Sequence, residues 1–226
     1  MASELSDVNL EKIEFLKRLF SSDYAVIFLV RVRDLECVMK VHRGRGPRQY
    51  YEREGELDIH IHETKAYARL KERGICDRGI VPQYLGSISK FDPSKCQPHL
   101  SMFQEDEYLP SALFLEYIPG LEMISLTNYT PQRVENLVSG MREIHKALVC
   151  HNDPQARNMM IVKDSPDRVV WLDFDRARTF DEDHITEQEE EEYLRAEDRI
   201  LEEFRVGMEA DYQNGEINKT FLFFYA

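Results

Sequence analysis

The chain of 226 residues is long enough for one large domain or two small lobes, and its 42% hydrophobic and 31% charged side chains are ordinary for a globular protein. Its 29 Lys and Arg against 42 Asp and Glu give a net charge of -13, which disfavours nucleic acid and anionic membranes as partners because the overall field repels phosphate. The sequence has no apolar run of bilayer length, no apolar signal core after Met1 and no Cys-x-x-Cys pair, so we expect a reduced, cytoplasmic protein without membrane partners.

The first part of the chain is rich in β-type sequence. Ala25 to Val32 is a strongly β-type run, Glu36 to His42 predicts the next strand, and Arg33-Asp34 between them indicates a hairpin turn. The apolar spacing of Ile13 to Leu19 fits either an amphipathic helix or a strand, and both remain open.

The second strand of this hairpin carries a lysine among apolar neighbours. Its period-two alternation places Val38, Lys40 and His42 on one face. Further along, the spacing of apolar residues from Ile61 to Arg73 predicts a helix, which Gly74 would end.

Two more strands are expected before the middle of the chain. Pro82 to Ser89 and Ala112 to Ile118 are strand-like, and the polar, proline-containing stretch between them predicts a loop or an irregular insert. Pro119-Gly120 then interrupts the pattern. We therefore predict an N-terminal lobe of residues 1–118 and a C-terminal lobe of residues 119–226 within a single domain.

The second half of the chain predicts helices. Thr130-Pro131 has the chemistry of a helix start and opens the amphipathic run Gln132 to Leu148, and Tyr193 to Met208 predicts a last helix. The acidic run Glu187 to Glu192 is either a solvated face or a disordered tether. The aromatic cluster Phe221 to Tyr225 either docks on the core or, if exposed, marks a surface for a partner.

The stretch between these two helices carries the candidate chemistry. His151, Asp153 and Asn158 form the pattern His-x-Asp-x-x-x-x-Asn, a short hairpin follows, and Asp173 then opens Asp-Phe-Asp. Asp and Asn in such places also serve as turn residues and strand caps. Phosphoryl transfer, however, needs one carboxylate to orient the nucleophile, and a carboxylate with an amide oxygen to hold magnesium.

Four segments that are separated in the sequence follow one another in an order that resembles the protein-kinase-like superfamily. They are the strand lysine Lys40, the helix glutamate Glu63, the strand end Phe114 to Gly120, and the stretch from His151 to Asp175. The chain is similar in size and style to short fungal kinase-like proteins and to the aminoglycoside and choline phosphotransferases. The resemblance implies an α+β class and a two-lobed protein-kinase-like fold with a truncated helical C-terminal lobe.

For the N-terminal lobe, the resemblance implies a nucleotide site. Lys40 would act in catalysis by contacting the α- and β-phosphates of ATP, and Glu63 would pair with it. Without the other motifs, a strand lysine is more often a solvated edge residue. Leu115 would occupy the gatekeeper position. Glu116, Tyr117 and Ile118 would form the hinge, whose backbone groups bind adenine.

For the C-terminal lobe, the resemblance implies the transfer machinery. Asp153 would be the catalytic base that orients a substrate hydroxyl, and Asn158 and Asp173 would ligate magnesium. His151 would support the loop rather than carry a proton. The implied cofactors are ATP and Mg2+, and the implied partner is a small-molecule substrate.

Two departures from the family pattern bear on the function. Ser21-Ser22-Asp23-Tyr24 stands where family members carry a glycine-rich loop, and no glycine precedes Gly44. The chain after Asp175 is also shorter than the helical substrate platform of a protein kinase. We therefore expect an ATP- and magnesium-dependent phosphotransferase whose acceptor is a small molecule rather than a protein.

Other functions remain open. The chain could be a pseudokinase binding module, or its cleft could serve a different reaction on a small metabolite, because fold does not fix function. A regulatory protein that acts through the acidic run is a third alternative. His60 and His62 have a spacing that suits a strand-borne metal site, which is disfavoured because no further ligand lies near them in the sequence.

Overall fold

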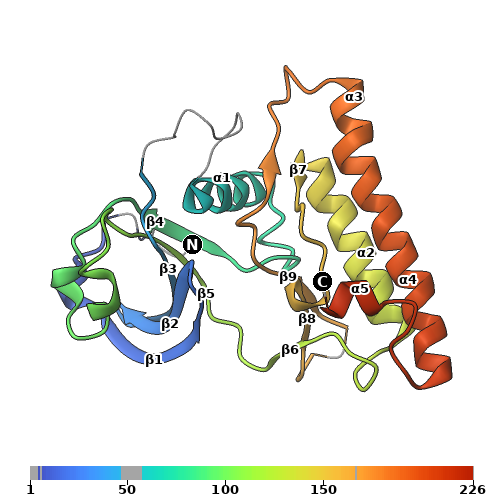
Figure 1. Ribbon diagram of the computed structural model, residues 1–226, viewed down its shortest axis with the longest axis horizontal. Helices are drawn as coiled ribbons and strands as arrows, with labels where there is room; N and C mark the ends of the chain where they lie inside the picture. Colours follow the sequence, from blue (N-terminus) through green and yellow to red (C-terminus); the bar gives the residue numbers. More distant parts are fainter. Residues whose placement is uncertain (1–4, 6, 47–57, 166, 226) are drawn as a thin grey trace. The chain divides into compact units, whose positions relative to one another are not determined.

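The computed structural model describes residues 5, 7–46, 58–165 and 167–225 (Figure 1). These residues form a mixed α+β structure with an antiparallel sheet, as the sequence predicts. The chain divides into two compact units, which interleave along the sequence. The first unit comprises the chain up to Thr64 and Gln83–Tyr117, and the second comprises Lys65–Pro82 and the chain from Ile118.

The first unit is built on a five-stranded antiparallel sheet with the strand order β1-β2-β3-β5-β4 (Figure 1). Residues 14–21 form a strand, which settles the choice that the sequence left open between helix and strand. The strands are β1 (Glu14–Ser21), β2 (Ala25–Val32), β3 (Leu35–His42), β4 (Tyr84–Ile88) and β5 (Ser111–Glu116).

The predicted hairpin turn fixes the register of β3. Val32 pairs with Leu35, so Arg33 and Asp34 alone make the turn, and both have positive φ, 49° and 65°. Such two-residue turns match the right-handed twist of the strands they join. Because a slip by one residue would exchange the two faces of the strand, this turn determines which face Lys40 occupies.

The two faces of β3 have different surroundings. Cys37, Met39 and Val41 are fully buried in the hydrophobic core of the first unit. The stretch between β4 and β5, expected as a loop or irregular insert, supplies part of this core through Leu100 and Phe103. It contains two short 3-10 helices, Pro93–Cys96 and Ser101–Phe103. The opposite face of β3 carries Val38, Lys40 and His42.

Helix α1 (Ile59–Glu72) confirms the helix predicted from residue 61. The division between the two units falls inside it, after Thr64. The helix ends at Gly74, whose φ of 70° is the left-handed conformation that glycine adopts without a steric penalty. Glu63 is therefore held on a regular helix rather than on a loop.

The second unit packs two long helices beside short strands (Figure 1). Helix α2 (Pro131–Lys146) begins where predicted, with the hydroxyl of Thr130 accepting the N–H of Arg133. Two strand groups accompany it, β6-β8-β9 and β7-β10. Their strands are β6 (Leu121–Met123), β7 (Val149–Cys150), β8 (Met159–Val162), β9 (Val169–Trp171) and β10 (Arg178–Thr179).

The β8–β9 hairpin that the sequence predicted is anchored to α2 by a tryptophan. Trp171 is fully buried, and its indole N–H donates to the carbonyl of Leu137 at 2.9 Å. This bond satisfies the one polar atom of a large apolar side chain. The hairpin end that follows Trp171 is thereby held in place.

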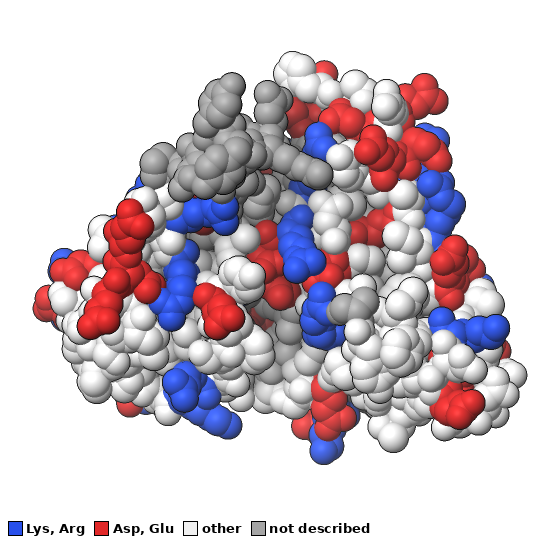
Figure 2. All heavy atoms as spheres, viewed as in Figure 1, with Lys and Arg blue, Asp and Glu red and all other residues white. Residues whose placement is uncertain are grey.

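The acidic run is helical. Helix α3 (Glu187–Glu189) has a capping box with Thr186 and leads through a π-helical segment, Glu190–Arg195, into α4 (Ala196–Asn214). Figure 2 shows acidic side chains gathered over this region with basic ones beside them. Arg195 and Arg199 pair with glutamates of the run. Of the two alternatives, the solvated face is therefore correct.

The prediction that the helix around Tyr193 to Met208 is the last one is wrong, because α5 (Phe221–Tyr225) follows it. The buried carboxylate of Asp211 accepts the N–H groups of Lys219 and Thr220 and the Thr220 hydroxyl, which folds the chain back on α4. The ring of Phe223 then lies 4.9 Å from that of Phe204. Helix α5 is docked on one side, while three of its side chains stay exposed: Phe221, Leu222 and Tyr225.

In the described ranges, no helix combines the length and the apolar character that crossing a membrane requires.

Gly74→Ala is expected to destabilise the protein by about 1–2 kcal/mol, the cost of a left-handed conformation for an L-residue with a Cβ. The loss comes from the backbone alone, because a Cβ at this position meets no atom within 4 Å. Gly74→Asn is the matched control, since asparagine tolerates this conformation better. Urea unfolding of the three proteins measures the difference, and an alanine variant as stable as wild type would contradict the account of how α1 ends.

Candidate functional site

The first unit contains a buried ion pair between the two residues predicted to form one. Lys40 Nζ lies 2.9 Å from Glu63 Oε1 and 2.8 Å from Glu63 Oε2. Only 7% of Lys40 and 1% of Glu63 are exposed. Two charges removed this far from water need each other, because either one alone would be strongly destabilising. The strand and the helix therefore bring these residues together as the sequence predicts.

The same carboxylate has a second buried partner. His42 Nε2 lies 2.9 Å from Glu63 Oε2, and the His42 side chain is fully buried. Burial by itself would raise the pKa of Glu63, but the charge of Lys40 and the hydrogen bond from His42 outweigh it and lower the pKa to about 2. Glu63 is therefore ionised at neutral pH. The sequence placed His42 on the face of Lys40 without assigning it a role.

A second histidine lies one helical turn before Glu63. His60 is 2% exposed, and its ring centroid is 5.6 Å from that of His42. Burial, and then the nearby His42, lower the pKa of His60 to about 4, so it is neutral at neutral pH. Among the residues that the structure describes, no three His, Cys, Asp or Glu side chains gather as a metal site.

The four residues predicted for the hinge include the point in the sequence where the first unit ends and the second unit resumes. Leu115 is buried in β5 and pairs with Val38 and Tyr84 of the neighbouring strands. The side chain and the N–H of Glu116 both bond the backbone of Gln83. Tyr117 is the last residue of the segment Gln83–Tyr117 of the first unit, and Ile118 is the first residue of the following segment of the second unit.

In the second unit, the predicted base and one predicted magnesium ligand are bonded to each other. Asn158 Nδ2 donates to the backbone carbonyl of Asp153 at 2.8 Å and to its Oδ2 at 3.0 Å. Both side chains are more than nine-tenths buried. A 3-10 turn, Ala156–Asn158, closes the loop between them. The spacing of five residues thus forms one small hydrogen-bonded unit.

The third predicted residue, Asp173, lies at the same end of the β8–β9 hairpin. Met159 pairs with Trp171, and the N–H of Leu172 donates to the carbonyl of Asn158 at 3.1 Å. Asp173 follows directly, with a φ of 66°, in the left-handed region that aspartate adopts more readily than most residues. The residue before Asp173 is thus bonded to Asn158.

Three buried aromatic rings pack in a row beside the loop that contains Asp153. His151 Nε2 donates to the carbonyl of Leu172 at 2.9 Å, as suits the supporting role predicted for it. Its ring lies 4.6 Å from that of Phe174, which in turn lies 5.1 Å from Tyr67 of α1. The column His151–Phe174–Tyr67 therefore connects the loop before Asp153 with the segment after Asp173.

The loop is also held by a carboxylate that the sequence analysis did not single out. Glu197 Oε1 accepts the N–H of Asn152 at 2.7 Å, and Oε2 accepts the N–H of His151 at 3.0 Å. Asn152 has a φ of 60°, a left-handed conformation that asparagine tolerates, and these two bonds fix the backbone just before Asp153. A signal was present, because Glu197 lies on the apolar stripe of α4 that includes Leu201.

Glu197 also has a bonding partner on α2. His145 Nε2 lies 2.7 Å from Glu197 Oε2, and its Nδ1 lies 2.9 Å from Asp198 Oδ1. Burial alone would lower the pKa of His145, but the bonds to the two carboxylates raise it to about 9. His145 is therefore a buried cation at neutral pH, and it offsets the negative charge that Glu197 brings to the loop.

The carboxylate of Asp153, the predicted catalytic base, also forms an ion pair with an arginine. Arg157 Nη2 lies 3.0 Å from Asp153 Oδ1 and 3.1 Å from Oδ2, and the arginine side chain is 46% exposed. Together with Asn158 it occupies both oxygens of this carboxylate. A hydroxyl that used Asp153 as its proton acceptor would replace one of these contacts.

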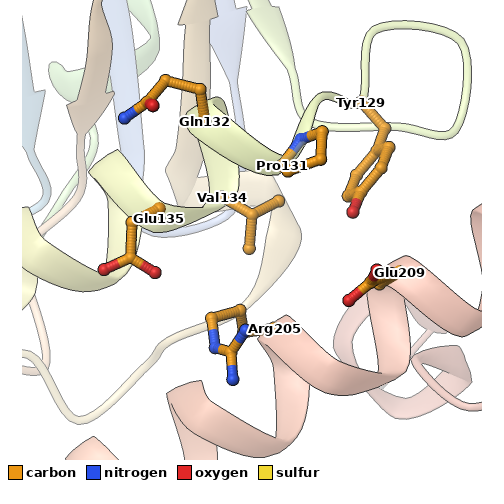
Figure 3. A pocket seen from close by; sticks show the side chains of 7 residues that line it. All are labelled: Tyr129, Pro131, Gln132, Val134, Glu135, Arg205 and Glu209. Atoms are coloured by element: carbon orange, nitrogen blue, oxygen red, sulfur yellow. The ribbon is translucent and has the colours of Figure 1, made fainter.

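A separate pocket of about 290 Å³ lies between the start of α2 and α4 (Figure 3). Its polar lining places the guanidinium of Arg205 among the carboxylates of Glu135 and Glu209. None of the residues predicted for nucleotide or magnesium binding contributes to it. The candidate site is therefore not this pocket.

No protein-family model matches the sequence, and a search of curated proteins finds no match. Function has to be argued from the two clusters themselves.

His145→Gln is expected to be less stable than wild type at about pH 6, and this deficit should shrink as the pH rises through about 9. The raised pKa contributes stability that is complete below the unfolded value of about 6.5 and is lost as the folded-state histidine deprotonates. At about 1.4 kcal/mol per pKa unit, the contribution is at most about 3 kcal/mol. Urea unfolding at several pH values measures it, and a deficit independent of pH would refute the charged state of His145.

Proposed function

We propose that the chain belongs to the protein-kinase-like superfamily and transfers a phosphoryl group from ATP, with magnesium, to a hydroxyl of a small molecule. On this proposal the fold is two-lobed with a reduced helical C-terminal lobe. The observation that carries it is the end of the β8–β9 hairpin, where Asn158 is bonded both to Asp153 and to the residue before Asp173. One carboxylate for the acceptor and one carboxylate with an amide for a metal are the groups that this chemistry requires.

The donor atoms at this hairpin end suit magnesium. Asn158 uses its amide nitrogen on Asp153, and because the amide is planar, its oxygen faces away from that carboxylate. Asp173 supplies a carboxylate from the neighbouring strand end. Protein sites for Mg2+ typically offer one or two such oxygens and leave the other positions to water and phosphate. Asn158 and Asp173 would hold the ion, which supplies charge neutralisation for the phosphates.

Lys40 would bind the α- and β-phosphates. Its ammonium group is held on Glu63 Oε1 and Oε2, so its position is defined by the protein's own side chains. A fixed cation lowers the energy of charge that develops during transfer without having to reorganise. The hinge residues Leu115, Glu116, Tyr117 and Ile118 would bind adenine.

Asp153 would orient the acceptor hydroxyl and receive its proton. The backbone that precedes it is fixed by Glu197, so the carboxylate is held in one place as positional catalysis requires.

A second candidate is a binding module that no longer transfers phosphate, and the turn between β1 and β2 favours it. The hydroxyl of Ser22 accepts the N–H groups of Tyr24 and Ala25, at 3.2 and 3.1 Å. These two backbone N–H groups are thus used within the turn rather than for phosphate. The following two variants separate this candidate from the phosphotransferase.

Asp173→Ala is expected to abolish magnesium-dependent binding of ATP, because it removes the one carboxylate proposed to hold the ion. Loss of a group that only supports a metal ligand already weakens metal binding about 10- to 100-fold, so loss of a ligand itself should lower the affinity for ATP with Mg2+ at least about tenfold. Calorimetric titration with ATP at fixed Mg2+ measures this. Asp164→Ala, on the exposed turn of the same hairpin, is the control; unchanged binding in the Asp173 variant would refute the metal assignment.

Asp153→Asn is expected to leave ATP and magnesium binding intact while turnover falls by about 10²- to 10⁴-fold, the usual contribution of a general base. Magnesium-dependent ATP consumption is the measurement. Asp167→Asn, at the exposed hairpin turn, controls for the change of charge. Retained turnover in the Asp153 variant would exclude it as the base. Wild-type binding without any ATP consumption would favour the binding module.

A further inference from the structure

His42 and Lys40 approach the same carboxylate from one strand. They are two residues apart on β3, so their side chains leave the same face of the sheet about 7 Å apart. Lys40 Nζ contacts both oxygens of Glu63, and His42 Nε2 contacts Oε2 at 2.9 Å. All three side chains are more than nine-tenths buried. The carboxylate of α1 is thus attached to β3 at two points rather than one.

The direction of the histidine bond follows from its partner. An ionised carboxylate only accepts, so the proton of this bond is on Nε2 of His42. The other ring nitrogen, Nδ1, has no hydrogen-bond partner among the described residues. A buried nitrogen left unsatisfied is unfavourable, and a phenylalanine would fill similar space without it. The choice of histidine is therefore explained by its bond to Glu63 and not by packing alone.

We propose that His42 is a positioning residue for the phosphate-binding lysine. By fixing Oε2 of Glu63 it prevents the carboxylate from rotating about its last bond, so Glu63 presents one arrangement of oxygens to Lys40. The ion pair is then held in one geometry by contacts within the protein. The role in ATP binding rests on the proposed phosphotransferase function, whereas the effect on Lys40 itself does not.

Three variants separate positioning from space-filling. His42→Phe keeps a ring of similar size but removes the hydrogen bond. His42→Gln restores an N–H donor at about the same reach along the side chain. His60→Phe makes the same change of chemistry at the neighbouring buried histidine, for which no bond to Glu63 is seen. All three are compared as full-length protein, with folding checked by circular dichroism.

The first readout needs no nucleotide. Acetic anhydride modifies accessible lysines, and mass spectrometry of the peptides gives the rate at Lys40 relative to the exposed Lys146. In His42→Phe this rate should rise about tenfold, as expected when a buried hydrogen bond to a charged group is lost. His42→Gln and His60→Phe should remain close to wild type. The second readout is the affinity for ATP with Mg2+, which should fall in His42→Phe and recover in His42→Gln.

The outcomes are distinguishable. An unchanged Lys40 rate in folded His42→Phe overturns the proposal, and so does an equal rise in all three variants, which would indicate loosened packing. If wild type does not bind ATP, the proposed function fails while the acetylation readout still decides the role of His42. If His42→Phe does not fold, 15N spectra of wild-type protein labelled at histidine decide it, because a proton found on Nδ1 and not on Nε2 contradicts the bond to Glu63.

Discussion

Each compact unit is organised around a carboxylate that is buried and fully used as a hydrogen-bond acceptor. An ionised carboxylate out of water is stable only when donors surround it, so its donors must lie at fixed places. Glu63 meets this requirement through Lys40 and His42 of β3, and Glu197 meets it through His145 and two backbone N–H groups of the loop before Asp153. The positions of the candidate functional groups depend on these two arrangements.

The sequence was informative where local physical rules decide the structure. The β2–β3 turn, the cap of α2 at Thr130 and the end of α1 at Gly74 are all set by residues within a few positions, and each was predicted. The pairing of Lys40 with Glu63 was also predicted, but from the order of motifs in a family that the chain resembles, whereas the bond between Asp153 and Asn158 was not predicted. Spacing alone does not specify a contact between a strand and a helix that begins some twenty residues later.

Some contacts that the sequence did not reveal join segments far apart in the chain, and others are local. Glu197 lies more than forty residues from the loop it holds, and Asp211 fixes a turn that creates α5 after a helix expected to be the last. A glutamate on a mostly apolar helix face indicates that a buried partner exists, but it does not identify that partner. Nothing in the sequence pointed to Arg157, because an arginine four residues after an aspartate is common on exposed turns.

The thermal unfolding midpoint tests most directly the proposal that this chain binds ATP through magnesium. Wild-type protein is measured with ATP alone, with Mg2+ alone and with both. A ligand that binds only the folded state adds about 2.7 kcal/mol of stability at a hundredfold excess over its Kd. The account predicts a clear rise in the midpoint when ATP and Mg2+ are present together. A midpoint unmoved by millimolar ATP with Mg2+ would contradict it and would direct the search to other small metabolites.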